Sequence, residues 1–349
     1  MLKPENYNRD LAAACAGIAE SGLMNGKRVL ITGATGLIGS FLVDALAWLN
    51  RERGAEVEIY AAARSAEKVK ARFGGLCDSP RFHYVAYDAC KPVCFDFDAD
   101  VVIHAACSAH PLAYSKDPAG TMQANLIGTV NLLEYLRGQD GATLIFLSTG
   151  ETYGERPDLP EGFGETDYGY IDPMNPRSCY PESKRAAETL CASYAAQYGV
   201  DARVARLCHV YGPTLTGENS RADAQFLRKA LAGEDIVMKS TGAQVRSFCY
   251  VADCAAGLFT LLEKGERGEA YNIANPGSVG SIRDYAETLA DIAGVKLAFD
   301  LPPEAEKAGY TKITRAVLNP AKLMALGWRP AYDLRHGLEQ TYRALKPER

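Results

Sequence analysis

The chain has 349 residues, of which 47% are hydrophobic and 23% are charged, and its formal net charge is −5. This composition is ordinary for a globular protein, and the length suffices for one large α/β unit or for two lobes with a shared core. Because no block of Lys and Arg stands out and no apolar run approaches the roughly 18 residues that span a bilayer, neither nucleic acid nor a membrane is expected as a partner.

The first residues and the cysteines bear on the compartment. The stretch from Met1 to Asp10 is polar and lacks the apolar core of a secretory signal, and the ten cysteines are scattered. Both observations favour reduced thiols in the cytoplasm. Cys90 and Cys94 are only four residues apart, but neither a second pair nor a histidine cluster accompanies them, so we expect no metal site.

The predicted elements begin with an amphipathic helix over residues 8–24, which forms an N-terminal helical extension over residues 1–25. Strands are then predicted over 28–31, 57–63, 82–86, 101–104, 144–148 and 202–207, and helices over 39–50, 66–73, 121–137 and 181–198. This alternation predicts an α/β fold, with a doubly wound parallel sheet and helices on both faces.

After residue 212 the alternation breaks up, and Gly and Pro become frequent. We therefore expect a dinucleotide-binding domain over residues 26–205, to whose sheet the chain returns near 245–273, at the segments 245–251 and 270–273. A smaller, irregular substrate-binding lobe is expected from residues 206–244 and 274–349.

A glycine-rich loop follows the first predicted strand. In VLITGATGLIGSFLVDAL, residues 29–46, three glycines stand between a strand and a helix. The first permits a tight turn, the second lets the backbone approach a pyrophosphate, and the third lets the helix pack close to the sheet. A helix N-terminus also attracts negative charge. We predict a dinucleotide site with loop contacts at Gly33, Thr35, Gly36, Leu37, Ile38 and Gly39.

The spacing Gly-x-x-Gly-x-x-Gly in TGATGLIG resembles the extended branch of the short-chain dehydrogenase/reductase superfamily, which implies a Rossmann fold and bound NAD or NADP. The second strand of such folds usually ends in an acid that holds the ribose of NAD. Here Ala63 stands near that position and Arg64 follows it. An Arg can accept a 2′-phosphate, which slightly favours NADP, whereas an Arg64 that only stacks on adenine would leave NAD bound. Asp88 matches a position that contacts the adenine edge in this branch.

Tyr180 and Lys184 in YPESKRAAETL are four residues apart and therefore share one face of a predicted helix. A protonated Lys near a phenol stabilises the phenolate and makes the Tyr a usable general base. The family resemblance implies that Tyr180 takes a proton from a sugar hydroxyl and that Lys184 also binds the nicotinamide ribose. It further implies that Thr149 positions the same hydroxyl, with Ser148 as the alternative.

The resemblance extends to nucleotide-sugar epimerases and dehydratases. HAACSAHP, residues 104–111, matches a loop that lines the nicotinamide and the sugar, which assigns Ala105 to the cofactor and His110 to the substrate. RLCHVYGP, residues 206–213, carries His209 where that family usually has Asn.

Arginines of the second lobe are candidates for binding a diphosphate, because Arg offers forked donors to phosphate oxygens. STGAQVRSFCYVAD, residues 240–253, places Arg246 where the family has an Arg that grips the diphosphate. Arg221 and Arg315 are further candidates, although a solvated surface Arg is the commoner case.

The stretch LSTGETYG, residues 147–154, bears on the reaction. Related 4,6-dehydratases carry Thr-Asp-Glu here and nucleotide-glucuronate decarboxylases carry Thr-Ser-Glu, whereas this chain has Thr149, Gly150 and Glu151. The missing acid disfavours loss of water, and the remaining Glu suits decarboxylation or chemistry at C5. Simple C4 epimerases usually lack this Glu. Alternatively, Glu151 only caps a turn.

These resemblances predict an NAD(P)+-dependent lyase that acts on a nucleotide-diphosphate sugar through a 4-keto intermediate and regenerates its cofactor in each cycle. The decarboxylase-like and dehydratase-like reactions are favoured. The alternatives are an epimerase, an ordinary reductase and a non-catalytic dinucleotide-binding scaffold. The family also implies a homodimer through the helices over 121–137 and 181–198. The apolar residues expected to supply its interface are Leu126, Val130, Leu133, Ala187, Leu190 and Tyr194.

Overall fold

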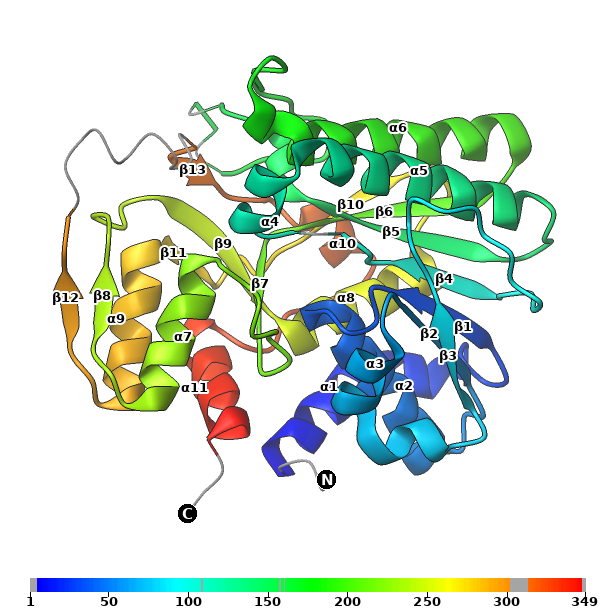
Figure 1. Cartoon of the computed structure of the whole chain (residues 1–349), viewed down its shortest axis with the longest axis horizontal. Coiled ribbons are helices and arrows are strands. Elements are labelled where there is room, and N and C mark those ends of the chain that lie inside the picture. Colours follow the sequence, from blue (N-terminus) through cyan, green and yellow to red (C-terminus); the bar gives the residue numbers. More distant parts are fainter. Residues whose placement is uncertain (1–4, 108, 157, 160, 302–312, 347–349) are drawn as a thin grey trace.

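The computed structural model describes residues 5–107, 109–156, 158–159, 161–301 and 313–346. Its main body is a parallel sheet in the order β10-β6-β5-β4-β1-β2-β3 (Figure 1). The strands are β1 (Arg28–Thr32), β2 (Glu58–Ala63), β3 (Phe82–Ala86), β4 (Val101–His104), β5 (Thr143–Thr149), β6 (Asp201–Leu207) and β10 (Ala270–Ile273). The strand order reverses between β1 and β4, which confirms the predicted doubly wound Rossmann fold.

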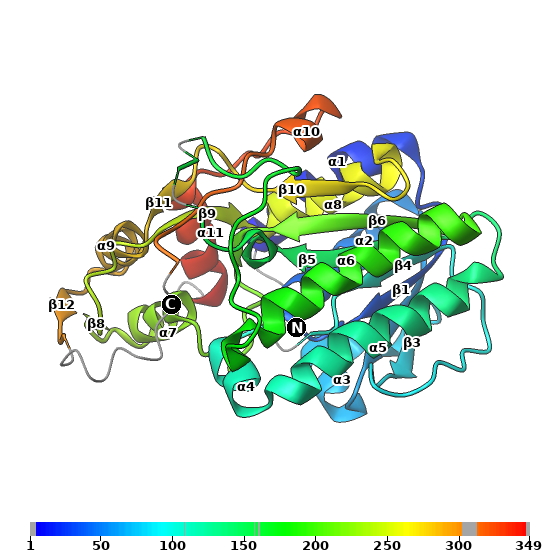
Figure 2. The ribbon, with the colours of Figure 1, turned by 90° about the horizontal axis from the view of Figure 1, so that it is seen from above.

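Alternate side chains of each strand serve two core layers, because successive residues point to opposite faces. Ile103 and Ile145 pack in the layer with α1, α2 and α8, whereas Val102 and Phe146 pack in the layer with α5 and α6. Figure 2 shows α5 and α6 side by side on one face of the sheet. The bounds are α1 (Glu5–Ser21), α2 (Leu37–Arg53), α8 (Val251–Lys264), α5 (Pro118–Arg137) and α6 (Cys179–Tyr198).

The second lobe contains two small sheets. Strand β9 pairs with β7, β11 and β13, and β8 pairs with β12. The prediction that residues 245–251 return to the main sheet is therefore wrong, although β10 does join it. The elements are β7 (His209–Tyr211), α7 (Ala222–Ala232), β8 (Ile236–Met238), β9 (Val245–Tyr250), β11 (Val279–Ser281), α9 (Ile282–Ala293), β12 (Leu297–Phe299), β13 (Arg315–Ala316) and α11 (Leu334–Leu345).

The N-terminal helix α1 runs from Glu5 to Ser21, so it begins and ends three residues earlier than predicted. The Tyr7 hydroxyl donates to Asp44 of α2 at 2.6 Å. The fully buried Asp10 accepts hydrogen bonds from Tyr250 at 2.6 Å and Tyr332 at 2.8 Å. Helix α1 thus joins the main sheet's helical layer to the end of β9 and to the segment before α11 (Figure 1).

The burial of α5 and α6 corrects part of the expected dimer face. Leu133 and Ala187 are fully buried within the subunit, because they pack between these helices and the sheet. The other four expected interface residues, Leu126, Val130, Leu190 and Tyr194, are partly exposed.

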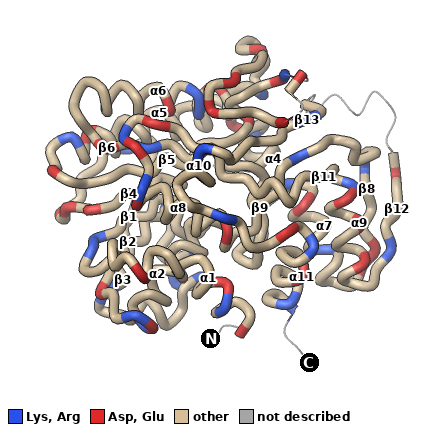
Figure 3. Tube along the Cα trace, turned by 180° about the vertical axis from the view of Figure 1, so that it is seen from behind, with Lys and Arg blue, Asp and Glu red and all other residues tan. Residues whose placement is uncertain are grey.

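Charges of both signs are dispersed along the chain (Figure 3). Within the described ranges, no helix combines the length and the apolarity that crossing a bilayer requires.

Candidate active site

The glycine loop brings backbone close together at the carboxyl end of β1. Gly33 has a φ of +69°, and a Cβ there would lie 2.8 Å from the carbonyl carbon of Ala105. A Cβ on Gly39 would lie 2.4 Å from the Gly33 oxygen, so helix α2 can begin this close to β1 only without a side chain. Gly36 is the N-cap and makes no side-chain cap, which leaves the first turn available to an anion. Thr35, Leu37 and Ile38 belong to this same turn.

The loop after β4 is held by a buried histidine. His104 Nδ1 lies 2.7 Å from Thr32 Oγ1, which also accepts the Ala106 N–H at 3.3 Å. Burial, and then the positive charge of Lys184, lower the pKa of His104 to about 3, so the ring is neutral near pH 7. Ala105 therefore stands in a fixed segment against Gly33.

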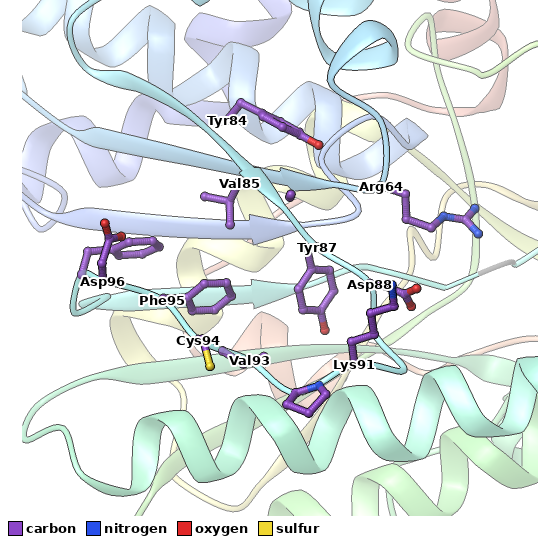
Figure 4. Close-up of a pocket in the computed structure, with 13 residues that line it drawn as sticks. Arg64, Tyr84, Val85, Tyr87, Asp88, Lys91, Val93, Cys94, Phe95 and Asp96 are labelled. Carbon is purple, nitrogen blue, oxygen red and sulfur yellow. The ribbon is translucent and has the colours of Figure 1, made fainter.

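The predicted adenosine contacts come from the ends of β2 and β3, which meet at one edge of the sheet. Arg64 and Asp88 lie at the same end of a cavity of about 600 Å³ (Figure 4). Arg64 is exposed, and the Asp88 carboxylate accepts the Cys90 N–H at 3.0 Å. The glycine cradle, the uncapped helix and this edge fit a dinucleotide.

Thr149, Tyr180 and Lys184 come together although 31 residues separate the first two. Thr149 ends β5, and Tyr180 opens α6, where its hydroxyl is hydrogen-bonded to the Thr149 side chain. The Lys184 ammonium donates to the Leu147 carbonyl at 2.8 Å and lies 4.6 Å from the centre of the Phe146 ring. The structure thus assembles the three residues that the sequence singled out.

The electrostatics of this group differ from the sequence argument. Burial, followed by the nearby Cys107 and Glu151, raises the pKa of Tyr180 well above its usual value, and the hydrogen bond with Thr149 opposes this shift. Burial also lowers the pKa of Lys184. The predicted lowering of the pKa of the phenol by Lys184 is therefore not seen in the structure described, where burial dominates.

Ser148 belongs to a separate network, which reaches the middle of α6 instead of its start. Its hydroxyl donates to Glu188, which forms a buried ion pair with Arg206 at 2.7 Å. Arg206 also donates to the Tyr153 hydroxyl at 3.0 Å, and that hydroxyl donates to Asn272 at 2.7 Å. Ser148 is thus directed into the fold, and Thr149 is the hydroxyl that reaches Tyr180.

Glu151 lies in a short turn, η2 (Gly150–Tyr153), directly after β5. Its carboxylate forms an ion pair at 2.8 Å with Arg177 of another short turn, η3 (Pro176–Ser178). The backbone N–H of Glu151 also donates to the Thr149 hydroxyl oxygen at 3.2 Å. The carboxylate is therefore held by a cation, which simple capping of a turn does not require.

Sequence reasoning missed three residues of this site, namely Arg177, Tyr114 and Cys107. Arg177 lies 4.5 Å from the centre of the Tyr114 ring, and Tyr114 of α4 (Pro111–Lys116) stacks on Tyr180 with ring centres 5.4 Å apart. Cys107 packs against the same two tyrosines. The signal for Arg177 was its place three residues before Tyr180, but no pattern in the sequence connects it with Glu151.

The predicted substrate residues form a second group. Burial, and then the positive charges of Arg221 and Arg246, lower the pKa of His209 well below its usual value. Arg246 donates to backbone carbonyls of Val245 at 2.8 Å and Ile313 at 2.9 Å. Arg315 of β13 lies beside this strand, in register with Val245.

Arg221 donates to the Val210 carbonyl at 3.0 Å and lies 3.4 Å from Asp223. Its buried Nε has no hydrogen-bond partner among the residues that the structure describes. A buried donor without an acceptor is costly, so a bound anion is a natural partner for it. The two arginines make this region suitable for a diphosphate.

The segment before α7 connects the two groups. Thr214 donates to the Leu37 carbonyl of the glycine loop at 2.7 Å, and Glu218 pairs with Lys68 of α3 (Ala66–Phe73) at 2.6 Å. His110 Nδ1 lies 3.1 Å from Ser220 Oγ. The second lobe therefore contacts the cofactor loop directly.

Comparison with known proteins identifies a family with this fold and similar sequences. The model of the NAD dependent epimerase/dehydratase family matches residues 29–274. UDP-glucuronic acid decarboxylase 5 of Arabidopsis thaliana is 35% identical over 89% of this chain and 87% of that protein. The structure of UDP-glucuronic acid 4-epimerase from Bacillus cereus, in complex with UDP-glucuronic acid and NAD, has a TM-score of 0.75 and 25% identity over 91% of this chain and 99% of that one. The UDP-glucose 4-epimerase of Thermus thermophilus, in complex with NAD, has a TM-score of 0.74 and 28% identity over 92% and 99%.

Proposed function

Because the chain belongs to the NAD dependent epimerase/dehydratase family, and is an enzyme that modifies nucleotide sugars, we propose that it decarboxylates a nucleotide-linked hexuronic acid, with UDP-glucuronate as the substrate. The observation that carries this proposal is the Glu151–Arg177 pair beside Thr149 and Tyr180. Gly150 stands where a dehydratase would need an acid, and it has no side chain to supply one.

The residues of the chain account for the proton movements. Tyr180 takes the proton from O4 and returns it at the end of the cycle, while Thr149 aligns the same hydroxyl and Lys184 holds the ribose. When bound, the oxidised nicotinamide supplies a hydride acceptor and a positive charge beside the phenol. Oxidation at C4 makes the substrate a β-keto acid, so the C5 carboxylate leaves as CO2. The carbanion at C5 then takes a proton from solvent, and Glu151 is the acidic group that we place beside it. Return of the hydride to C4, with the proton given back to O4 by Tyr180, would complete the UDP-pentose and leave the cofactor oxidised.

The diphosphate is assigned to Arg221 and Arg246, with His209 and His110 closer to the sugar. Arg221 has the unpartnered Nε, which supports this assignment. Glycine-loop residues Gly33 to Gly39 and Ala105 are assigned to the cofactor.

The test is incubation of the purified protein in heavy water with UDP-glucuronate and NAD+ or NADP+, followed by mass spectrometry of the nucleotide sugar. A UDP-pentose with release of CO2, one solvent deuterium at C5 and no net cofactor reduction is expected. A product of unchanged mass would establish an epimerase, and net reduction of the cofactor would establish a dehydrogenase. Absence of any conversion would contradict the proposal.

Glu151→Gln separates the proposed C5 role from turn capping. If Glu151 acts at C5, the variant still oxidises C4 but loses product formation and solvent exchange. Product at the wild-type rate would leave Glu151 with a structural role only.

We further propose NADP+ as an accepted cofactor, because Arg64 follows β2 in place of an acid. We also propose a homodimer through α5 and α6, since Met122 and Ile127 are exposed there in addition to the partly exposed Leu126 and Leu190. A two-fold interface uses one patch on both subunits. A monomeric mass by light scattering at micromolar concentration would refute the dimer.

A further inference from the structure

No sequence motif predicted a role for Arg177. Its side chain contacts both the Glu151 carboxylate and the stacked pair of Tyr114 and Tyr180. One side of its guanidinium forms the ion pair with Glu151 at 2.8 Å. Another lies 4.5 Å from the centre of the Tyr114 ring, which stacks on Tyr180 at an interplanar angle of 19°. A single cation thus links the carboxylate assigned to C5 with the aromatic pair that holds the general base.

The turn that carries Arg177 is held in place by its neighbours. The Asn175 side chain accepts the Arg177 N–H at 3.0 Å, and the Ser178 hydroxyl donates to the Asp172 carbonyl at 2.6 Å. The Arg177 side chain is 35% exposed and that of Glu151 is 27% exposed, so both groups border the open site instead of lying in the core.

We propose that Arg177 is a positioning residue that fixes the orientation of the Glu151 carboxylate for proton transfer at C5. This inference rests on the proposed function. The ion pair at 2.8 Å holds the carboxylate in one orientation instead of several, because a charge-assisted hydrogen bond is short and directional. The Tyr114 ring, which stacks on Tyr180, packs against the same guanidinium, so the carboxylate is held in a fixed position relative to the general base.

The matched test compares Arg177→Gln, Arg177→Lys and Arg156→Gln. Arg156 lies between β5 and α6 as well, is 38% exposed and pairs with Asp167 at 3.4 Å, so its replacement controls for loss of a loop ion pair. In Arg177→Gln, kcat for product formation is expected to fall about 10- to 100-fold with little change in KM, because misplacement of a catalytic group affects mainly the chemical step. Arg156→Gln should retain wild-type kinetics.

Rescue by the conservative variant separates positioning from a general structural effect. Arg177→Lys retains a cation beside Glu151 and should recover part of the lost kcat with KM unchanged. In the Glu151→Gln background, Arg177→Gln should cost little more, since the two residues act as a unit. No recovery in Arg177→Lys, or fully additive losses, would overturn the inference.

A crystal structure of Arg177→Gln gives an answer that does not depend on the substrate. The Glu151 carboxylate should leave its wild-type position, and an unchanged Glu151 would overturn the inference. Failure of the wild-type protein to convert UDP-glucuronate would instead refute the proposed function, which keeps the two failures distinct.

Discussion

Ser148 and Thr149 are neighbours at the end of β5, but they serve two regions with different tasks. The Ser148 side holds the buried pair of Glu188 and Arg206, whose side chains are 9% and 7% exposed. The Thr149 side holds Tyr180 and the partly exposed ion pair of Glu151 and Arg177. Both regions reach α6 but at different points, because Tyr180 opens this helix and Glu188 lies eight residues later. One residue step along β5 therefore separates a structural network from the chemistry.

Tyr180→Phe should have the largest effect, and only on the Thr149 side. Removal of a general base typically lowers turnover about 10²- to 10⁴-fold. Steady-state assay with UDP-glucuronate should show this loss, while cofactor binding and the denaturation midpoint stay nearly unchanged. Retention of most of the activity would mean that another group takes the O4 proton.

Glu188→Gln should show the reverse pattern. Breaking a buried ion pair leaves Arg206 uncompensated and is expected to lower the free energy of unfolding by about 3–5 kcal/mol. Chemical denaturation measures this loss. Ser148→Ala is the milder control, since it removes one hydrogen bond and should cost about 1 kcal/mol. A Glu188→Gln variant of wild-type stability would contradict the structural assignment of this network.

Arg64 belongs to neither network, so Arg64→Ala should change neither turnover at saturating NAD+ nor the free energy of unfolding. If Arg64 binds a 2′-phosphate, the variant should weaken NADP+ binding by about 10- to 100-fold, the value of a charge-assisted hydrogen bond, with little effect on NAD+. Calorimetric titration of both cofactors provides the measurement. Equal weakening would assign Arg64 to adenine stacking.

The smallest effect is expected at Asp253, which like Glu188 is a buried carboxylate with a structural role. It accepts the N–H groups of Ala331 and Tyr332, yet burial raises its pKa from 3.8 to about 6. A raised pKa means that the folded state binds the proton more tightly, so this stabilisation is complete below pH about 4 and is lost as the pH rises through about 6.

Between about pH 4 and pH 6, the free energy of unfolding of the wild type should fall by about 1–2 kcal/mol more than that of Asp253→Asn. A pKa shift of this size alone would imply a difference of roughly 3 kcal/mol, but the chain relaxes as the carboxylate ionises. Chemical denaturation of both proteins in steps of about one pH unit, from roughly pH 4 to pH 7, measures this difference. Parallel curves would show that Asp253 does not titrate in this range.

Local patterns predicted the parts of the molecule that a few adjacent residues determine. The glycine spacing predicted the close approach of α2 to β1. The place of Tyr180 at the start of a long helix distinguished it from Tyr87 and Tyr342, which are also followed by a Lys four residues later. Periodicity could not say which sheet β9 joins, because its buried residues look the same in either sheet. It also could not show that Leu133 faces the core instead of a partner subunit.

Contacts between distant turns were outside the reach of the sequence. Arg177 meets Glu151 across 26 residues, and two short irregular turns bring them together. The raised pKa of Tyr180 likewise depends on burial by α4 and its loop, which no spacing in the α6 motif encodes. Sequence patterns therefore carry information within one strand or helix, whereas a contact between two loops leaves no pattern to find.

The position of α1 also has a consequence for biosynthesis. Asp10 is bonded to Tyr250 and Tyr332, which follow it by 240 and 322 residues. During translation this helix leaves the ribosome long before either tyrosine has been synthesised. The Asp10 carboxylate therefore stays exposed to water until nearly the whole chain has emerged. Domains whose contacts are this distant in sequence fold slowly. The bonds of Asp10 are therefore expected to form late, whereas the bond of Tyr7 to Asp44, 37 residues later in the chain, can form early.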